Sequence, residues 1–368
     1  MPFYKRFIFS ICMLYFGTNC DVSASAPAGI YVISDTSYYA GEVERINVPQ
    51  TSGLSLRVLW TDIEGLDPVT GEIVYDFSRI IRALEELRAI NTKTTLEIFI
   101  NKVPDYILSM DDTVTWYNPH PSFGGLQVVP WDLNAFDAYY NMLEALSNQI
   151  VAGTEIRVAD HPSLSAVDAP ILGLQGIREL SGELVRHPDY TRGKFIDAVV
   201  ATIELSREIF SKQYGFVAIF GMDDLDTINP LDEELFANLM SYFNAGTTPQ
   251  LGFFQETLSD IGPTPTALGS FLAQASDSTY ILFQVLRPWQ ERVDTPPPPE
   301  IASGSPLLAI SQAWQDYGAT YVELYQNDVL DDANRDGLIA WDSFFHEISS
   351  ARSQNWKHRC MLTRVLKR

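Results

Sequence analysis

Short runs of apolar, β-branched and aromatic residues alternate along the chain with longer segments whose apolar positions recur every three or four residues. Residues 54–60 form one such run, and the segment that follows, residues 78–90, places Ile80, Leu84 and Leu87 on one helical face. Runs of this length predict strands, and the three-to-four spacing predicts helices. The alternation continues as far as Tyr325.

The pattern predicts seven strands, most of them separated by a helix. The strands are residues 54–60, 95–100, 169–177, 216–220, 251–256, 280–285 and 320–325. The helices are residues 78–90, a segment that Asp132 caps, residues 194–212, 231–243 and 306–316. Residues 29–34 are either an eighth strand or an N-terminal addition, and a further strand could lie within residues 114–130.

Strand and helix alternation over one domain favours a parallel sheet, and a closed barrel removes the edges of that sheet. We therefore predict an α/β fold, a single (β/α)₈ TIM barrel over residues 25–368 with a long irregular insertion around residues 101–131. The alternative is a doubly wound open sheet, but no strand is followed by a G-x-G-x-x-G turn. The four prolines at 296–299 indicate a stiff surface loop rather than a domain linker.

The first 24 residues have the organisation of a signal peptide. Lys5 and Arg6 precede the apolar run 7–16, and small residues follow at 22–26, with cleavage favoured after Ala24. The alternative is an N-terminal core strand. Cleavage would leave Cys360 as the single cysteine, so no internal disulfide is expected. We predict a secreted or periplasmic protein, and the lone cysteine fits a bacterial export route.

Charge and aromatic content narrow the class of ligand. The formal net charge is −22, and such a surface repels nucleic acid and anionic membranes. Seven tryptophans supply flat apolar faces that can stack on sugar rings. We therefore expect a carbohydrate partner, and neither nucleic acid nor membrane.

In a barrel of this kind the carboxyl ends of the strands form the active face. Acids, amides and indoles dominate there, and no histidine stands at a predicted strand end. No G-x-S-x-G turn is present either. A histidine-based triad or a histidine-rich metal site is therefore disfavoured, whereas two carboxyl groups across a cleft are what glycoside cleavage requires.

Several motifs together resemble the clan A glycoside hydrolases, with family 42 β-galactosidase-like and cellulase-like barrels the nearest in pattern. Arg57, Trp60 and Glu64 match R-x-x-W-x-x-x-E, and residues 75–77 and 103–106 follow in the same order. Residues 130–132 and 321–325 extend the resemblance over most of the chain. The resemblance implies a (β/α)₈ barrel that cleaves glycosidic bonds.

The resemblance also implies positions for the catalytic acids. The acid/base glutamate should follow the fourth strand, where Glu179 matches best by distance and Glu183 is the rival. The nucleophile should end the seventh strand, but that segment carries Gln284, which cannot attack. Glu256, one strand earlier, is the nearest carboxylate. Each of the three glutamates could instead be an ordinary solvated acid.

Other strand-end residues are candidates for substrate binding. Trp60 and Trp289 are expected to form cleft walls. The remaining candidates are Asp62, Arg178, Gln255, Gln284 and Glu323. For Glu323 the competing reading is an acid inside the barrel that pairs with Arg57, because an inward arginine needs a buried partner.

Residues 332–339 match the first eight positions of a calcium loop, with Asp332, Asn334 and Asp336 as ligands. Ser343 stands where the final bidentate carboxylate should be. The alternative is a polar loop before the last helix. No other cofactor is expected.

Three functions compete. The first is a secreted glycoside hydrolase of a neutral poly- or oligosaccharide that uses two carboxylates. The second is a catalytically inactive glycosidase-like barrel that binds glycans or acts as an extracellular scaffold. The third, a metal-dependent hydrolase on the same fold, is weakened by the shortage of histidine.

Overall fold

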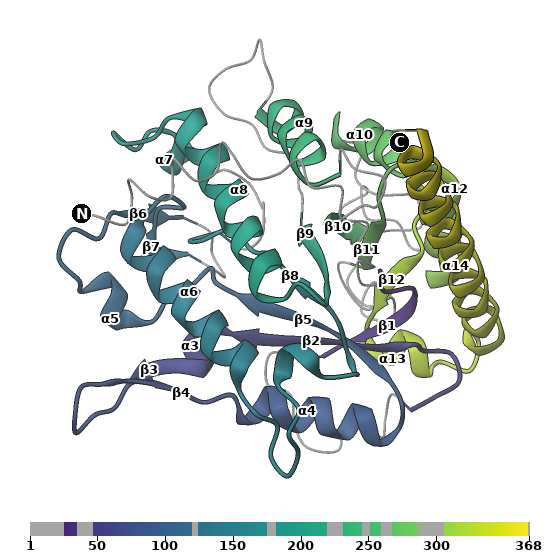
Figure 1. The fold of residues 1–368 in the computed structure, drawn as a ribbon, viewed down its shortest axis with the longest axis horizontal. Coiled ribbons are helices and arrows are strands. Elements are labelled where there is room, and N and C mark those ends of the chain that lie inside the picture. The colour runs from purple at the N-terminus through teal and green to yellow at the C-terminus, as the bar shows by residue number, and fades with distance from the viewer. Residues whose placement is uncertain are drawn as a thin grey trace.

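The computed structural model describes residues 26–34, 47–119, 124–174, 182–218, 231–244, 251–258, 267–285, 289 and 305–366. Eight parallel strands close into a barrel in the order β1-β12-β11-β10-β9-β8-β5-β2 (Figure 1). The strands are β1 (Gly29–Ile33), β2 (Gly53–Leu59), β5 (Lys93–Phe99), β8 (Leu164–Asp168), β9 (Tyr214–Ala218), β10 (Leu251–Leu258), β11 (Ile281–Val285) and β12 (Tyr321–Leu324). The predicted (β/α)₈ barrel is confirmed, and the open doubly wound sheet is excluded.

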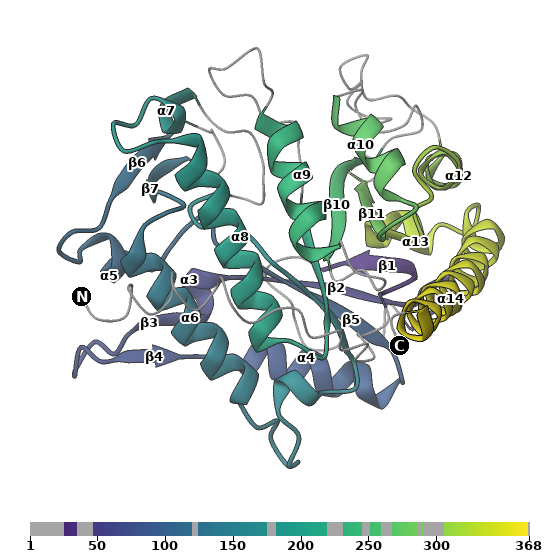
Figure 2. The same ribbon diagram turned by 45° about the horizontal axis from the view of Figure 1, so that its top comes forward.

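Helices surround the barrel on its outside (Figures 1 and 2). They are α3 (Trp60–Ile63), α4 (Ser78–Ala89), α5 (Asp105–Leu108), α6 (Leu133–Asn148), α7 (Gly182–Val185), α8 (Arg192–Ile209), α9 (Leu231–Phe243), α10 (Ala267–Ala275), α12 (Pro306–Tyr317), α13 (Gln326–Leu330) and α14 (Arg335–Leu366), with a 3₁₀ turn, η1, at Val158–Asp160. The Asp132 side chain accepts a hydrogen bond from the Ala135 N–H at the start of α6, as predicted. None of the helices in the described ranges is long and apolar enough to cross a bilayer.

Residues 29–33 form β1, a full member of the barrel that pairs with both β12 and β2. The N-terminal candidate, residues 29–33, therefore completes the eight strands, and it is the first of them in chain order. The segment 114–130 holds a two-stranded antiparallel hairpin outside the barrel, β6 (Thr115–Asn118) and β7 (Gly125–Val128). A second hairpin, β3 (Glu64–Leu66) and β4 (Ile73–Tyr75), follows β2.

The predicted strand at 169–177 is wrong over residues 169–174, because the fourth strand, β8, ends at Asp168, and residues 175–177 lie outside the described residues. The Ala169 N–H still donates to the Phe216 carbonyl, but Pro170 has no N–H with which to continue the ladder. Gly173 then adopts a φ of +69°, which turns the chain. Residues 169–174 are nevertheless buried, so their apolar character reflects burial as a loop and not a strand.

Two layers of side chains follow from the alternation along each strand. Residues such as Val58, Ile98 and Phe283 face the helices and belong to the main hydrophobic core. A second cluster fills the inside of the barrel toward the amino ends of the strands, with Tyr31, Tyr214, Phe216, Phe254 and Tyr321 among its members. Beyond this aromatic plug, toward the carboxyl ends, six of the eight strands have a polar residue at the inward position, whereas β9 ends at Ala218.

Candidate active site

The polar inner positions lie at the carboxyl ends of six strands. They are Arg57 on β2, Glu97 on β5, Asp168 on β8, Glu256 on β10, Gln284 on β11 and Glu323 on β12. Each follows an inward-facing position by two residues, as Asp168 follows Ala166 and Glu256 follows Phe254. All six are at least nine-tenths buried. Four carboxyl groups therefore share this end of the barrel with one arginine.

Arg57 is the centre of a hydrogen-bonded network. Its Nη2 donates to Glu323 Oε2 at 2.8 Å and to the amide oxygen of Gln284, and its Nε lies 3.4 Å from Glu97 Oε2. The predicted pairing of Glu323 with Arg57 is thereby confirmed. One guanidinium thus ties together β2, β5, β11 and β12.

Hydroxyl groups complete the network. Ser55 Oγ donates to Glu97 Oε1 at 2.6 Å, and Tyr321 donates to the other oxygen of Glu323. Thr95 Oγ1 lies 3.0 Å from the Tyr321 hydroxyl. Together with the two contacts from Arg57, these bonds fix Glu97 and Glu323 in place, because each of their four carboxylate oxygens has a partner.

Two of the acids are held toward their protonated forms. Burial raises the pKa of Asp168 well above its ordinary value, and the nearby Glu97 raises it further, against smaller opposite effects of the Ala169 N–H and Arg57. Burial likewise raises the pKa of Glu323, and Glu97 adds to the effect although Arg57 and Tyr321 oppose it. Asp168 Oδ1 has no hydrogen-bond partner among the described residues. The pKa of Asp168 is thus shifted toward the protonated form, and one of its two oxygens meets no hydrogen-bond partner among the described residues.

The structure settles the strand count on which the predicted catalytic pair depended. Gln284 is on the seventh strand and Glu256 is on the sixth, so an amide stands where the resemblance implies a nucleophile. Arg57 binds that amide oxygen directly. Gln255 alternates with Glu256 and pairs with Phe283 on the outer side of β10. Glu256 follows the inward Phe254 by two residues, although the register between β10 and β11 shifts between Gln255 and Leu258, whereas Gln255 has the parity of the outer layer.

The other predicted site residues are dispersed. Glu183 is on α7, with a side chain that is 53% exposed and lies 3.8 Å from Arg186. Asp62 is exposed and pairs with Arg79 at 3.2 Å. Glu179 and Arg178 lie outside the described residues. Glu183 is thus an exposed residue on a helix, whereas the acids of the cluster are buried on barrel strands.

The two tryptophans predicted as cleft walls are buried instead. Trp60 is fully inaccessible, with its ring 5.4 Å from that of Tyr139. Its Nε1 donates to Glu64 Oε2 at 2.5 Å, and the Tyr106 hydroxyl donates to the other oxygen of Glu64. Trp289 is 7% exposed, and its backbone N–H donates to Asp328. The indole of Trp60 supports a buried acid and offers no open face to a sugar.

The segment matched to a calcium loop forms the start of α14. The helix begins at Arg335, so Asp336 lies in its first turn. Asn334 donates to the Asp328 carbonyl at 3.0 Å, and the highly exposed Asp332 pairs with Arg335. Among the described residues, no group of three or more acidic, histidine or cysteine side chains is arranged to hold a metal. Calcium remains a sequence-based prediction without support from these contacts.

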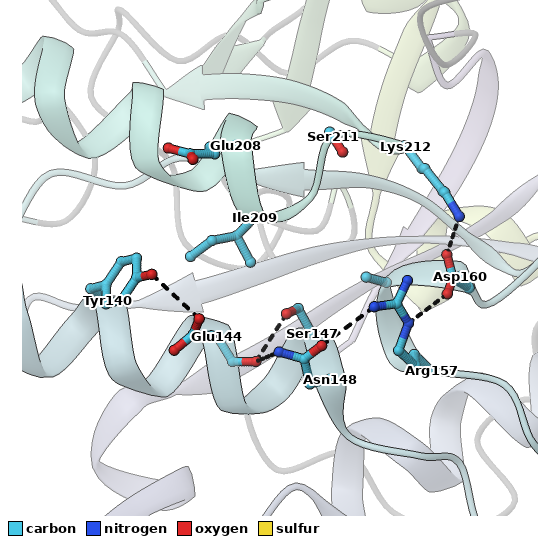
Figure 3. A pocket seen from close by; sticks show the side chains of 11 residues that line it. Tyr140, Glu144, Ser147, Asn148, Arg157, Asp160, Glu208, Ile209, Ser211 and Lys212 are labelled. Carbon is cyan, nitrogen blue, oxygen red and sulfur yellow. Dashed lines mark hydrogen bonds and ion pairs between the residues drawn. The ribbon is translucent and has the colours of Figure 1, made fainter. Parts of the chain in front are cut away.

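A hollow on the outside of the barrel, with a volume of about 230 Å³, lies between α6 and α8 (Figure 3). Three of its charged groups pair with one another: Asp160 binds Lys212, and its other oxygen lies 2.7 Å from Arg157 Nε. Asp160 and Lys212 precede β8 and β9, which places this hollow by the amino ends of the strands. It is therefore opposite the buried acids and does not extend their site.

Sequence reasoning overlooked Glu97, Asp168 and Glu64. Glu97 lies within the predicted strand 95–100, and an acidic residue inside an apolar strand was a sign of a polar position inside the barrel. Asp168 was overlooked because the fourth strand was placed after it. Glu64 was noted after the first predicted strand and in a motif but not chosen as a site residue, and the Tyr106 hydroxyl from another loop donates to it.

Comparison with known proteins supports the fold. No protein-family model and no curated protein sequence matches the chain. Among solved structures, an endo-1,4-β-mannanase from Rhizomucor miehei aligns with a TM-score of 0.55 at 11% identity, over 88% of this chain and 95% of its own. The catalytic domain of a β-amylase from Paenibacillus polymyxa aligns with a TM-score of 0.55 at 8% identity, over 87% and 98%. An endo-β-1,4-mannanase from Thermotoga petrophila gives 0.51 at 8% identity, over 89% and 78%.

These three structures are glycoside hydrolases, so the chain has a glycosidase-like (β/α)₈ barrel. The resemblance to the clan A barrels that the motifs indicated is confirmed for the fold. At these identities the likeness concerns the architecture, and the chemistry has to be argued from the residues.

Proposed function

We propose that this protein is an exported glycoside hydrolase that cleaves a neutral poly- or oligosaccharide with two carboxyl groups. The observation that carries the proposal is the cluster of four buried carboxyl groups at the active end of a glycosidase-like barrel. Glycoside cleavage needs one carboxyl that is protonated at working pH and one that is ionised. A cluster in which burial and mutual repulsion raise the pKa of selected members meets that need.

Export is supported by the signal-peptide pattern of residues 1–24, and the strongly acidic composition agrees with a neutral ligand. The sugar class is suggested by the structural neighbours, two of which are β-1,4-mannanases and one a β-amylase. The first substrates to test are therefore β-mannan, starch and their oligosaccharides.

The test is the release of reducing ends from these glycans by the purified protein. Wild type is expected to release them, and Glu256→Gln is expected to lower the rate by 100-fold or more, on the order of the effect of losing a general acid or base. Glu179→Gln and Glu183→Gln decide whether either predicted glutamate takes part. Equal turnover in wild type and in all three variants would refute the proposed site.

A second function is favoured by one observation. Gln284 occupies the inner position of the seventh strand and is fixed there by Arg57, in place of an acid. A barrel that binds glycans without cleaving them would show saturable binding of the same oligosaccharides by calorimetry and no release of reducing ends. That result would select the binding protein over the hydrolase.

A further inference from the structure

The hairpin formed by β6 and β7 carries two exposed apolar side chains on one face. Tyr117 is 65% exposed and Leu126 is 53% exposed. The two residues pair directly across the antiparallel strands, so their side chains are neighbours on the same face. Tyr117 is also the most exposed aromatic residue in the part of the chain that the structure describes. We call this pair of side chains the Tyr117 platform.

The opposite face of the hairpin is packed against the protein. Trp116 and Gln127 pair across the two strands and are both buried. The Trp116 Nε1 donates to the Val128 carbonyl at 3.0 Å, and α7 lies beside β6 (Figures 1 and 2). The hairpin is therefore held on one face while the Tyr117 platform stays open to solvent on the other.

The Tyr117 platform lies at the same end of the barrel as the buried acids. β5 ends at Phe99, two residues beyond Glu97, and the chain then passes through α5 into β6. After β7 it continues into α6. The hairpin is thus part of a connection from a barrel strand to the next long helix, and such connections gather at the carboxyl ends of the strands. A ligand on the platform would be bound on the active face, opposite the hollow between α6 and α8.

The segment that carries the platform has no ionised side chain to offer an ionic partner. Residues 113–131 contain no Asp, Glu, Lys or Arg, although 20% of the whole chain is charged. Electrostatic complementarity needs charge on both partners, so this segment does not select for a charged one. It offers aromatic, aliphatic, amide and hydroxyl side chains instead. These groups suit a neutral ligand that has both apolar faces and hydroxyl groups, as sugar rings do.

We propose that the Tyr117 platform is a glycan-binding site that holds a neutral polysaccharide chain on the active face, in addition to any contact that the chain makes with the buried acids. The Tyr117 ring packs against the apolar face of one sugar ring, and Leu126 extends this apolar contact along the ligand. The inference rests on the proposed function for its choice of ligand.

The test is affinity electrophoresis in native gels that contain soluble galactomannan or soluble starch. All variants are made in the Glu256→Gln protein, so that binding is compared while cleavage is slowed. Tyr117→Ala is expected to lower the affinity by about 10-fold, the order expected for the loss of one aromatic contact. Equal affinity in Tyr117→Ala and in its parent would overturn the inference.

The matched control is Tyr242→Ala. Tyr242 is an exposed tyrosine on α9, 48% accessible, and lies outside the hairpin. This variant is expected to bind both glycans as its parent does. A loss as large as that in Tyr117→Ala would show that the effect does not belong to the platform, and it would also overturn the inference.

Two further variants separate ring stacking from a general apolar contact. Tyr117→Trp keeps a flat aromatic face and is expected to retain the affinity to within about 3-fold. Tyr117→Leu keeps apolar surface without a ring and is expected to lose as much affinity as Tyr117→Ala. Because the ligand is neutral, added salt is expected to leave binding unchanged. Full binding by Tyr117→Leu, or binding that salt abolishes, would contradict the proposal.

The platform and the hydrolase can fail separately. Release of reducing ends by wild type, with unchanged glycan affinity in Tyr117→Ala, would overturn the platform and leave the hydrolase in place. Binding that depends on Tyr117, without release of reducing ends, would refute the hydrolase and support the platform. Sedimentation tests the other occupant of this face: a wild-type dimer that Tyr117→Ala converts to a monomer would assign the face to a second copy of the chain and overturn the inference.

Discussion

Arg57 is the single cation among the described inner residues of the acid cluster, so its removal is the most informative perturbation of the fold. Arg57→Met keeps much of the side-chain volume but leaves Glu323 and Gln284 without their shared donor and Glu97 without its ion-pair partner. Breaking a buried ion pair from one side costs about 3–5 kcal/mol. Because one guanidinium serves two carboxyl groups, we expect a loss at the upper end of that range.

The assay is urea unfolding followed by circular dichroism at pH 5 and at pH 8. The loss is expected to be larger at pH 8, because burial raises the pKa of Glu323 and the lost guanidinium no longer opposes that rise, so protonating Glu323 costs more at the higher pH. Arg79→Met is the matched control: Arg79 pairs with Asp62 at 3.2 Å at the surface, and exposed pairs contribute about 1 kcal/mol or less. A loss below about 1 kcal/mol in Arg57→Met, or one that is equal at both pH values, would refute the reasoning.

Three further predictions concern single groups. The pKa of Asp168 is raised in the folded state, so its contribution to stability falls as pH rises from its unfolded value through the folded one; Asp168→Asn is expected to flatten that part of a stability profile between pH 4 and 8, and an unchanged profile would argue against a protonated Asp168. Burial lowers the pKa of His161, so stability is lost as pH falls through its unfolded value toward the folded one, and His161→Asn is expected to weaken this acid sensitivity in thermal melts. Gly173→Ala would place a Cβ 2.0 Å from the Val128 carbonyl oxygen at a φ of +69°, whereas Gly71→Ala, at a φ of +73°, meets no atom within 4 Å. Gly173→Ala is expected to destabilise the protein by about 2 kcal/mol or more beyond Gly71→Ala, which is roughly the strain of an overpacked site. Equal melting temperatures of the two variants would contradict the close approach of Gly173 to Val128.

The elements were predictable where local pattern and tertiary burial agree. The apolar run at β2 and the spaced apolar positions of α4 gave boundaries within one or two residues. The fourth strand was misplaced because residues 169–174 are as apolar as a strand, although they are buried as a loop. Composition alone does not distinguish these two forms of burial, but Pro170 and Gly173 were local signs of the loop.

The site was less predictable because its residues come from six strands and meet only in the closed barrel. The pairing of Arg57 with Glu323 followed from a general rule about buried arginines, and it holds. The roles of Trp60 and Trp289 did not follow from their positions at strand ends. The indole of Trp60 turns into the core to bind Glu64, a direction that depends on packing against Tyr139.

The most direct test of the central claim, that the buried acids cleave a glycosidic bond with water, is hydrolysis in heavy-oxygen water. Mass spectrometry of the products reports whether the label enters the new reducing end. We predict one labelled oxygen per cleavage in wild type, and none above background in the Asp168→Asn, Glu256→Gln double variant. Binding of the same glycans by a folded wild type, with no labelled product, would contradict the account.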